Sequence, residues 1–259
     1  MPTLRLGHRG HRCPGWDEPE NSLAAFDRAL AAGCDGLELD LRHTRDGRVV
    51  IHHDEALHGS GLRLAETSCL ALRRLHPPLA TLEQVLARYR HRAWLDLEIK
   101  TEAALVPTLR LLARLPPRRG YVISCFDVEV LHRLAELAPD VPRCLNLKRP
   151  GSLRRIRAAD VSWVAPHQAS CTAWYVQWLH RHGWKVLVWT VNHPRRMQLL
   201  ARAQAEAIVS DRPDLLVEAL RVASLATPPR ATASGSGDEQ RLLGYPAAGR
   251  APRRVVPQP

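Results

Sequence analysis

Short apolar runs alternate with longer amphipathic stretches along most of the chain. Runs of Val, Ile and Leu bounded by Gly, Pro or Asp are typical of buried parallel strands. Stretches whose apolar residues recur three or four positions apart are typical of helices that cover a sheet. We expect strands at Thr3–Gly7, Gly36–Leu41, Trp94–Ile99, Tyr121–Cys125, Pro142–Leu147, Ser162–Ala165, Lys185–Thr190 and Ala207–Ser210.

A helix-like stretch follows each of these eight strand candidates. This series predicts a closed parallel (β/α)8 barrel, or TIM barrel, because an open doubly wound sheet would need fewer strands or a second domain. The chain has 259 residues, and a barrel of this kind typically takes about 250. We expect helices at Ser22–Ala32, Thr81–Tyr89, Glu102–Leu115, Val128–Ala138, Leu153–Ala158, Ala173–His182, Pro194–Gln204 and Pro213–Ala223.

One further strand-like run, Arg48–His53, does not fit the alternation. Because Asp46-Gly47 is a turn signal, we expect Leu37–Arg42 and Arg48–His53 to form a hairpin at the top of the barrel. The insertion Gly59–Ala80 then lies between this hairpin and the next helix, where we expect a small cap or rim without a distinct apolar lobe.

The composition changes near the C-terminal end. Residues 1–224 carry the alternation and predict one barrel domain. Residues 225–259 are rich in Pro, Gly, Ala and Arg and have no apolar periodicity, so we expect them to form a disordered tail.

Acidic residues interrupt the second predicted strand in an unusual way. Side chains alternate across a strand, so Glu38 and Asp40 share one face while Leu37, Leu39 and Leu41 share the other. If the leucines face the helices, the two carboxylates face the barrel interior. Two neighbouring carboxylates repel each other unless a proton or a cation lies between them. Oxygen ligands of this kind are preferred by Mg²⁺ and Ca²⁺.

The strand Trp94–Ile99 repeats this arrangement. Asp96, Glu98 and Lys100 share one face, and Glu98 and Lys100 lie nearest the strand end, where barrel enzymes carry their catalytic groups. Asp96 lies one layer deeper, where we expect it to support its neighbours. The alternative is a purely structural salt-bridge network, which is costly to bury.

Two histidines are placed to exchange protons with a substrate. His8 is in phase with Leu4 and Leu6, and His53 is in phase with Val49 and Ile51. Imidazoles titrate near neutral pH and can act as general acids or bases. His52 points to the opposite side, so we expect a surface or supporting role for it.

The formal net charge of +11 raises the question of a nucleic-acid or anionic-membrane partner. Arginine supplies nearly all of the 37 basic residues and is scattered over the predicted helices. We therefore interpret the charge as a solvated basic surface and expect no nucleic-acid partner.

The cysteines and the N-terminal segment indicate the cellular compartment in which the protein is expected. The six cysteines lie far apart and form no CxxC pair, which argues against a zinc ribbon or a disulfide framework and favours a reducing compartment. The chain has no signal-peptide-like stretch and no run of about 18 apolar residues. We expect a cytoplasmic protein without stable membrane insertion.

Several short motifs together resemble the glycerophosphodiester phosphodiesterase family. A lone His-Arg-Gly is a weak signal, but the ordered series is highly specific, and the resemblance covers roughly residues 3–223. The motifs are His8-Arg9-Gly10, Pro19-Glu20-Asn21, Glu38-Leu39-Asp40, His53-Asp54, Glu98-Ile99-Lys100, Ser124-Cys125-Phe126, Trp189-Thr190-Val191-Asn192 and Ser210-Asp211-Arg212-Pro213.

This resemblance implies a TIM barrel that hydrolyses glycerophosphodiesters to glycerol 3-phosphate and an alcohol, and the short insertion Gly59–Ala80 favours a small, water-soluble substrate. It implies that Glu38, Asp40 and Glu98 hold a divalent metal ion, Ca²⁺ or Mg²⁺. By analogy with related phosphoinositide lipases, His8 is the general base and His53 the general acid, although the residues alone allow the opposite assignment.

For the substrate contacts, the resemblance implies that Arg9 and Lys100 touch the phosphate and that Trp189 lies beside the substrate. Two routes remain open. In one, water attacks the phosphate directly, and in the other, the glycerol hydroxyl attacks first and gives a cyclic phosphate that water then opens.

Other readings remain open as well. Glu20 could reach the metal or cap a helix, and Phe126, Asn192 and Asp211 could contact substrate or only support the site. A phospholipase D-type enzyme acting on lysophospholipids is the second functional hypothesis. A non-catalytic barrel that binds phosphate or nucleic acid is the third.

Overall fold

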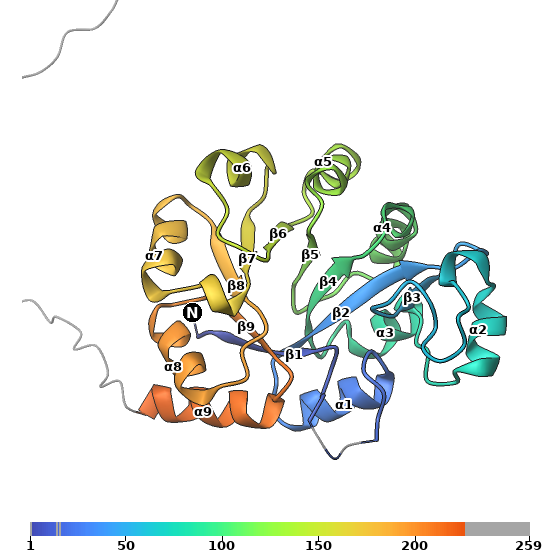
Figure 1. Ribbon diagram of the computed structural model, residues 1–259, viewed down its shortest axis with the longest axis horizontal. Helices are drawn as coiled ribbons and strands as arrows, with labels where there is room; N and C mark the ends of the chain where they lie inside the picture. The colour runs from blue at the N-terminus through green and yellow to red at the C-terminus, as the bar shows by residue number, and fades with distance from the viewer. Residues whose placement is uncertain (1, 14, 16, 226–259) are drawn as a thin grey trace, which may run out of the picture. The chain divides into compact units, whose positions relative to one another are not determined.

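Eight parallel strands pair side by side and close into a barrel in the computed structural model (Figure 1). The structure describes residues 2–13, 15 and 17–225. The strand order is β1-β9-β8-β7-β6-β5-β4-β2, and pairing of β1 with β2 closes the ring, which confirms the predicted TIM barrel. The strands are β1 (Leu4–His8), β2 (Gly36–His43), β4 (Trp94–Ile99), β5 (Tyr121–Cys125), β6 (Arg143–Leu147), β7 (Trp163–Pro166), β8 (Lys185–Val188) and β9 (Ala207–Ser210).

Helices surround the barrel and cover the outer faces of its strands (Figure 1). Most begin at a residue whose side chain accepts a backbone N–H, as Ser22 does for α1 and Thr81 for α3. The helices are α1 (Leu23–Ala31), α3 (Leu82–Tyr89), α4 (Leu105–Arg114), α5 (Val128–Leu137), α6 (Leu153–Ala158), α7 (Ala173–Arg181), α8 (Pro194–Arg202) and α9 (Pro213–Leu225). Among the described helices, none is long and apolar enough to cross a membrane.

The expected helix Glu102–Leu115 begins later than predicted. Residues Glu102–Ala104 form a 3₁₀ turn, and the α-helix starts at Leu105. The reason is Pro107, which has no backbone N–H and is tolerated only in the first turn of a helix. A later start at Leu105 places this proline in that first turn.

Two apolar clusters lie on opposite faces of the barrel strands, one against the helices and one inside the barrel. Leu37, Leu39 and Leu41 of β2 pack outward against the helices, as the alternation predicts. The lower interior is filled by Leu6, Trp94, Val122, Cys144, Trp163, Ala165, Leu187, Ala207 and Val209. Along β4 the inward side chains change from Trp94 to Asp96 and then Glu98, so polar groups collect at the C-terminal ends of the strands.

The predicted hairpin is present, but the insertion after it differs from the expectation. Strand β3 (Val49–Ile51) pairs antiparallel with β2. The insertion contains a short 3₁₀ turn and α2 (Cys69–Leu75). The expectation of no apolar lobe was wrong, because a separate buried cluster is present. The sequence did not reveal it, because its leucines are spaced too irregularly to form a local pattern and meet only after the chain folds back. The lobe consists of Val50, Leu57, Leu64, Cys69, Leu72 and Leu79.

The predicted C-terminal tail, residues 225–259, lies outside the described residues except for Leu225, which ends α9.

Candidate active site

Three carboxylates converge at the C-terminal ends of β2 and β4. Glu38, Asp40 and Glu98 are all buried, and one oxygen from each lies within 4.8 Å of the others. Asp40 and Glu98 are register partners on the two adjacent strands. The period-two alternation and parallel pairing together bring the three predicted ligands into one cluster.

Burial makes a full negative charge on this cluster unfavourable. Desolvation, together with the charge of Asp40, raises the pKa of Glu38 well above its usual range. Desolvation also raises the pKa of Glu98. Burial acts the same way on Asp40, but Lys100 and Arg9 outweigh it and hold the pKa of this carboxyl below its usual range. A cation at the cluster would therefore replace the protons on the two glutamates.

Two basic side chains lie against the carboxylates. Lys100 Nζ is 2.5 Å from Glu98 Oε1 and 3.0 Å from Asp40 Oδ1. Arg9 Nε is 3.0 Å from Asp40 Oδ2. The backbone of Arg9 has φ of 55°, a left-handed conformation that is unusual outside glycine, and its N–H bonds to the Glu38 carbonyl at 2.9 Å.

The donor set fits a hard divalent cation. All three groups offer oxygen, the ligand type that Ca²⁺ and Mg²⁺ prefer. Asp40 Oδ1 is buried and receives no aligned hydrogen bond from the described residues, despite its proximity to Lys100. Asn21 donates from Nδ2 to the other oxygen, Oδ2, at 2.8 Å, which orients the carboxylate.

His8 reaches the cluster from the end of β1. Its Nε2 is 3.7 Å from Glu38 Oε2, and its Nδ1 is 2.7 Å from Asp211 Oδ1. Because an ionised carboxylate only accepts hydrogen bonds, Nδ1 carries the proton and Nε2 is left to face the site. Burial lowers the pKa of His8 despite the opposing effect of Asp211. Burial would raise the pKa of Asp211, but hydrogen bonds from His8 and Asn192 bring it down to about 2.

His53 stands across the same cavity and is held by its neighbour. Its Nδ1 lies 2.7 Å from Asp54 Oδ1, which orients the ring as Asp211 orients His8. His52 is partly buried, and burial lowers its pKa. It does not line the cavity that holds His53.

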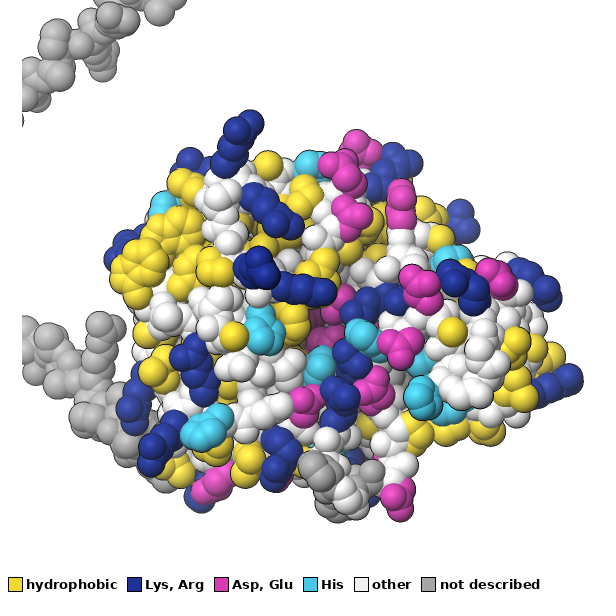
Figure 2. All heavy atoms as spheres, viewed as in Figure 1, with side chains coloured by type: hydrophobic (Ala, Val, Ile, Leu, Met, Phe, Trp, Pro, Cys, Tyr) yellow, Lys and Arg dark blue, Asp and Glu magenta, His cyan; other side chains and the backbone are white. Residues whose placement is uncertain are grey.

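The cavity above the cluster has a volume of about 320 Å³. Figure 2 shows acidic, basic and histidine side chains gathered around the hollow near the centre of the displayed face. Trp189 forms one wall, held by a 2.7 Å hydrogen bond from Nε1 to the Ala165 carbonyl and an edge contact with Phe126. The lining includes His8, Arg9, His53, Glu98, Lys100, Phe126, Lys148 and Trp189.

Comparison with known proteins identifies the family to which this arrangement belongs. The model of the glycerophosphoryl diester phosphodiesterase family matches residues 8–215. The chain belongs to this family.

Curated relatives match over most of their length. A glycerophosphodiester phosphodiesterase from Caldanaerobacter subterraneus is 26% identical over 247 residues, which cover 85% of this chain and 99% of that protein. One from Bacillus subtilis is 25% identical over 250 residues, covering 82% and 84%.

Solved structures share the fold. A phosphodiesterase from Oleispira antarctica, in complex with the product sn-glycerol-3-phosphate, has a TM-score of 0.73 and 23% identity and covers 85% of this chain and 97% of its own. A glycerophosphodiester phosphodiesterase from Thermotoga maritima has a TM-score of 0.72 and 23% identity, covering 84% and 98%.

Glu20 forms two ion pairs at the edge of the active site of this phosphodiesterase. Its carboxylate pairs with Arg9 Nη1 at 2.8 Å and with Arg12 Nε at 2.7 Å. Ser22 caps α1 instead, and the metal-ligand cluster does not include Glu20. The residue positions Arg9 through an ion pair, which sequence spacing alone does not reveal.

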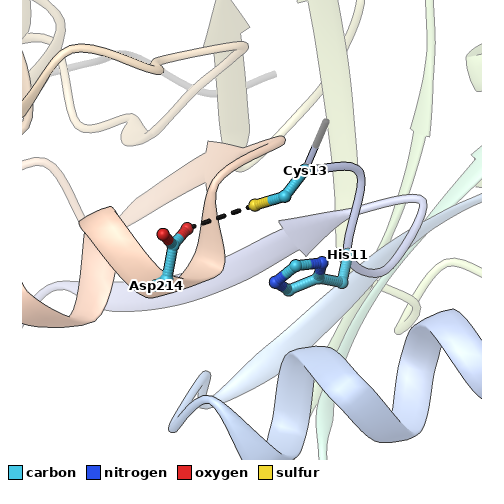
Figure 3. A group of neighbouring side chains, drawn as sticks. All are labelled: His11, Cys13 and Asp214. Atoms are coloured by element: carbon cyan, nitrogen blue, oxygen red, sulfur yellow. Dashed lines mark hydrogen bonds between the residues drawn. The ribbon is translucent and has the colours of Figure 1, made fainter. Parts of the chain in front are cut away.

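A second group of potential ligands lies behind Asp211 and has a structural role. Figure 3 shows Cys13 pointing toward Asp214, with His11 beside them. Cys13 Sγ is 3.3 Å from Asp214 Oδ1, and burial and Asp214 raise the pKa of this thiol to about 11. Arg212 donates two hydrogen bonds to Asp214 at 3.0 and 2.8 Å. These contacts join the loop after β1 to the start of α9, next to the Asp211 that holds His8.

Three residues of the site were missed or left undecided at the sequence level. Asn21 orients Asp40, Asp211 orients His8, and Lys148 lines the cavity 5.4 Å from the centre of the Phe126 ring. Asn21 and Asp211 do lie in family motifs, which is the only sequence signal for them. Nothing local marks Lys148, which follows β6.

Asp211→Asn is expected to lower kcat/KM by about 10²–10³-fold, because an amide cannot accept from His8, Arg12 and Asn192 at once. Asp211 raises the pKa of His8, so its loss should move the acid limb of the pH profile to lower pH. Steady-state rates across pH measure both effects. Asp140→Asn, on the surface, is the control, and an unshifted limb at wild-type rate would contradict the assigned role.

Proposed function

We propose that this protein hydrolyses glycerophosphodiesters to glycerol 3-phosphate and an alcohol with the help of Ca²⁺ or Mg²⁺. The observation that carries the proposal is a cavity lined by His8, His53 and Glu98. Glu98 also belongs to the cluster of three buried carboxylates whose oxygen atoms lie close enough together to hold a cation. Membership of the family and the product-bound Oleispira antarctica neighbour support the same reaction.

Each of the two histidines carries out one of the two proton transfers of the reaction. His8 is neutral near pH 7, because burial lowers its pKa, and its Nε2 is available to take the proton of the attacking hydroxyl. His53, oriented by Asp54, donates a proton to the departing alkoxide. Asp211 stabilises the imidazolium that forms on His8, as a carboxylate partner does in other acid–base pairs.

The phosphate is bound by positive charge at the mouth of the carboxylate cluster. Glu38, Asp40 and Glu98 would hold the divalent ion, which supplies charge neutralisation at the phosphoryl oxygens. Arg9 and Lys100 are already fixed by ion pairs with Asp40, so little reorganisation is needed when negative charge builds on the phosphate.

The cavity favours small substrates. A volume of about 320 Å³ with polar and aromatic walls suits a glycerol phosphate group and a short alcohol. Trp189 and Phe126 offer flat apolar surfaces to the carbon side of the glycerol. The lysophospholipid alternative would require an apolar channel for an acyl chain, and no described residue of the cavity wall supports one.

We further propose a cytoplasmic protein that supplies glycerol 3-phosphate from lipid-derived diesters, without a nucleic-acid partner. The free thiols of all six cysteines support a reducing compartment. The scattered arginines support a solvated surface instead of a nucleic-acid groove.

Chelation tests the proposal directly. EDTA should abolish release of glycerol 3-phosphate from glycerophosphocholine, glycerophosphoethanolamine and glycerophosphoglycerol, and Ca²⁺ or Mg²⁺ should restore it. Lysophosphatidylcholine serves as the comparison substrate. Full turnover in EDTA would exclude the metal, and preference for lysophosphatidylcholine would exclude the small-diester assignment.

A further inference from the structure

A second cavity lies on the flank of the barrel, away from the catalytic groups. It has a volume of about 750 Å³, larger than the active-site cavity, and lies between the hairpin turn, α2, α3 and α4. Figure 1 shows these elements together on one side of the barrel. Four arginines line it: Arg48, Arg73, Arg74 and Arg110.

The acidic groups of this groove are already occupied. Asp46 accepts hydrogen bonds from the Thr44 hydroxyl at 2.6 Å and from the Cys69 backbone at 2.9 Å. Glu83 pairs with Arg114 at 2.9 Å and more loosely with Arg48 at 3.7 Å. Asp46 keeps its charge, but neither carboxylate forms an ion pair with Arg73, Arg74 or Arg110, so the four arginines outnumber the two acids of the groove.

Arg73, Arg74 and Arg110 have no such partners. All three are exposed, and their side chains form no ion pair or hydrogen bond with any residue in the described part of the chain. Three guanidinium groups around one concave surface create a positive potential that an anion would relieve. Guanidinium groups match the oxygens of a phosphate in geometry, because they donate two parallel hydrogen bonds.

Apolar groups complete the groove. Leu70 lines it while 63% exposed, and Pro77 and Pro107 contribute further carbon surface. The N-terminal end of α3 borders the groove through Thr81 and Gln84, which bond to each other in a capping box. A ligand that suits these walls carries a phosphate group attached to a less polar body.

We propose that this groove binds the phosphate group of a second, non-substrate ligand. The ligand chemistry is a phosphate-bearing anion, either a free phosphoester or the head group of an anionic phospholipid. The site is independent of the catalytic cavity, so its occupancy does not require the proposed hydrolysis.

The test replaces two exposed arginines and keeps the fold. Arg73→Gln/Arg74→Gln removes two groove charges, and Arg154→Gln/Arg155→Gln removes two exposed charges from α6 as the matched control. Calorimetric titration with inorganic pyrophosphate in EDTA detects a free phosphate ligand. Flotation with vesicles of phosphatidylcholine, with and without phosphatidylglycerol, detects a lipid head group.

The groove variant should bind one of the two probes at least about tenfold more weakly than wild type and control, with unchanged hydrolysis of a small diester. Weaker pyrophosphate binding by the groove variant than by wild type and the control identifies a free phosphoester. Loss of binding to phosphatidylglycerol vesicles alone identifies a lipid head group. Equal behaviour of the groove variant and the control with both probes would overturn the proposal.

Discussion

Glu38→Gln is expected to lower the hydrolysis of glycerophosphodiesters by at least about 10³-fold, because it removes one anionic ligand from the carboxylate cluster. The amide keeps the size of the side chain, so the cavity keeps its shape. Affinity for Mg²⁺ or Ca²⁺, measured by calorimetry, should fall with the rate. The rate and the metal affinity must change together, since both depend on the same oxygen.

The same variant should not unfold the protein. The folded-state pKa of Glu38 is raised by burial, so above its ordinary value of 4.5 the folded state keeps a proton that the unfolded state has lost. Stability therefore falls as pH rises through this range, and Gln removes that cost. In EDTA at pH 8 the variant should melt at or above the wild-type temperature. Glu102→Gln, at an exposed position, is the control, and wild-type turnover by Glu38→Gln would refute the assignment.

His8→Ala should reduce kcat/KM by about 10²–10⁴-fold, the contribution expected of a general base. The pKa of His8 is lowered from 6.5 by burial, so the base form persists to a pH below that value. The acid limb of the wild-type pH–rate profile should therefore lie below pH 6.5. This acid limb should disappear in the variant, because the group that titrates is gone.

His91→Ala provides the comparison for this variant, since His91 is exposed and lies outside the cavity. The melting temperature of His8→Ala should stay close to that of wild type, because the deletion leaves a part-exposed space at the cavity wall. A large loss of rate with the acid limb still present would assign the titrating base to another residue.

Local periodicity accounts for most of what can be predicted here. The alternation in β2 and β4 is a property of neighbouring residues, so it places Glu38, Asp40, Glu98 and Lys100 inside the barrel without any knowledge of long-range contacts. Parallel pairing then brings the two strands into register, with Asp40 beside Glu98. The barrel itself follows from the repeated strand–helix order.

Features that depend on closure of the barrel cannot be predicted from local periodicity. Asp211 reaches His8 only because β9 pairs with β1, a contact between residues 203 positions apart. Asn21 adopts φ of 59° to direct its amide at Asp40, and no spacing rule predicts that geometry. The leucines of the insertion meet through turns, so their separate cluster appears only in three dimensions.

The central claim is that three buried carboxylates form one cation site facing two imidazoles. Crystals grown with Mn²⁺ in place of Ca²⁺ or Mg²⁺ test it most directly through the anomalous-difference map. We predict a peak about 2.0–2.6 Å from oxygens of Glu38, Asp40 and Glu98. A map with no peak there, and with these carboxylates bound only by Arg9 and Lys100, would contradict it.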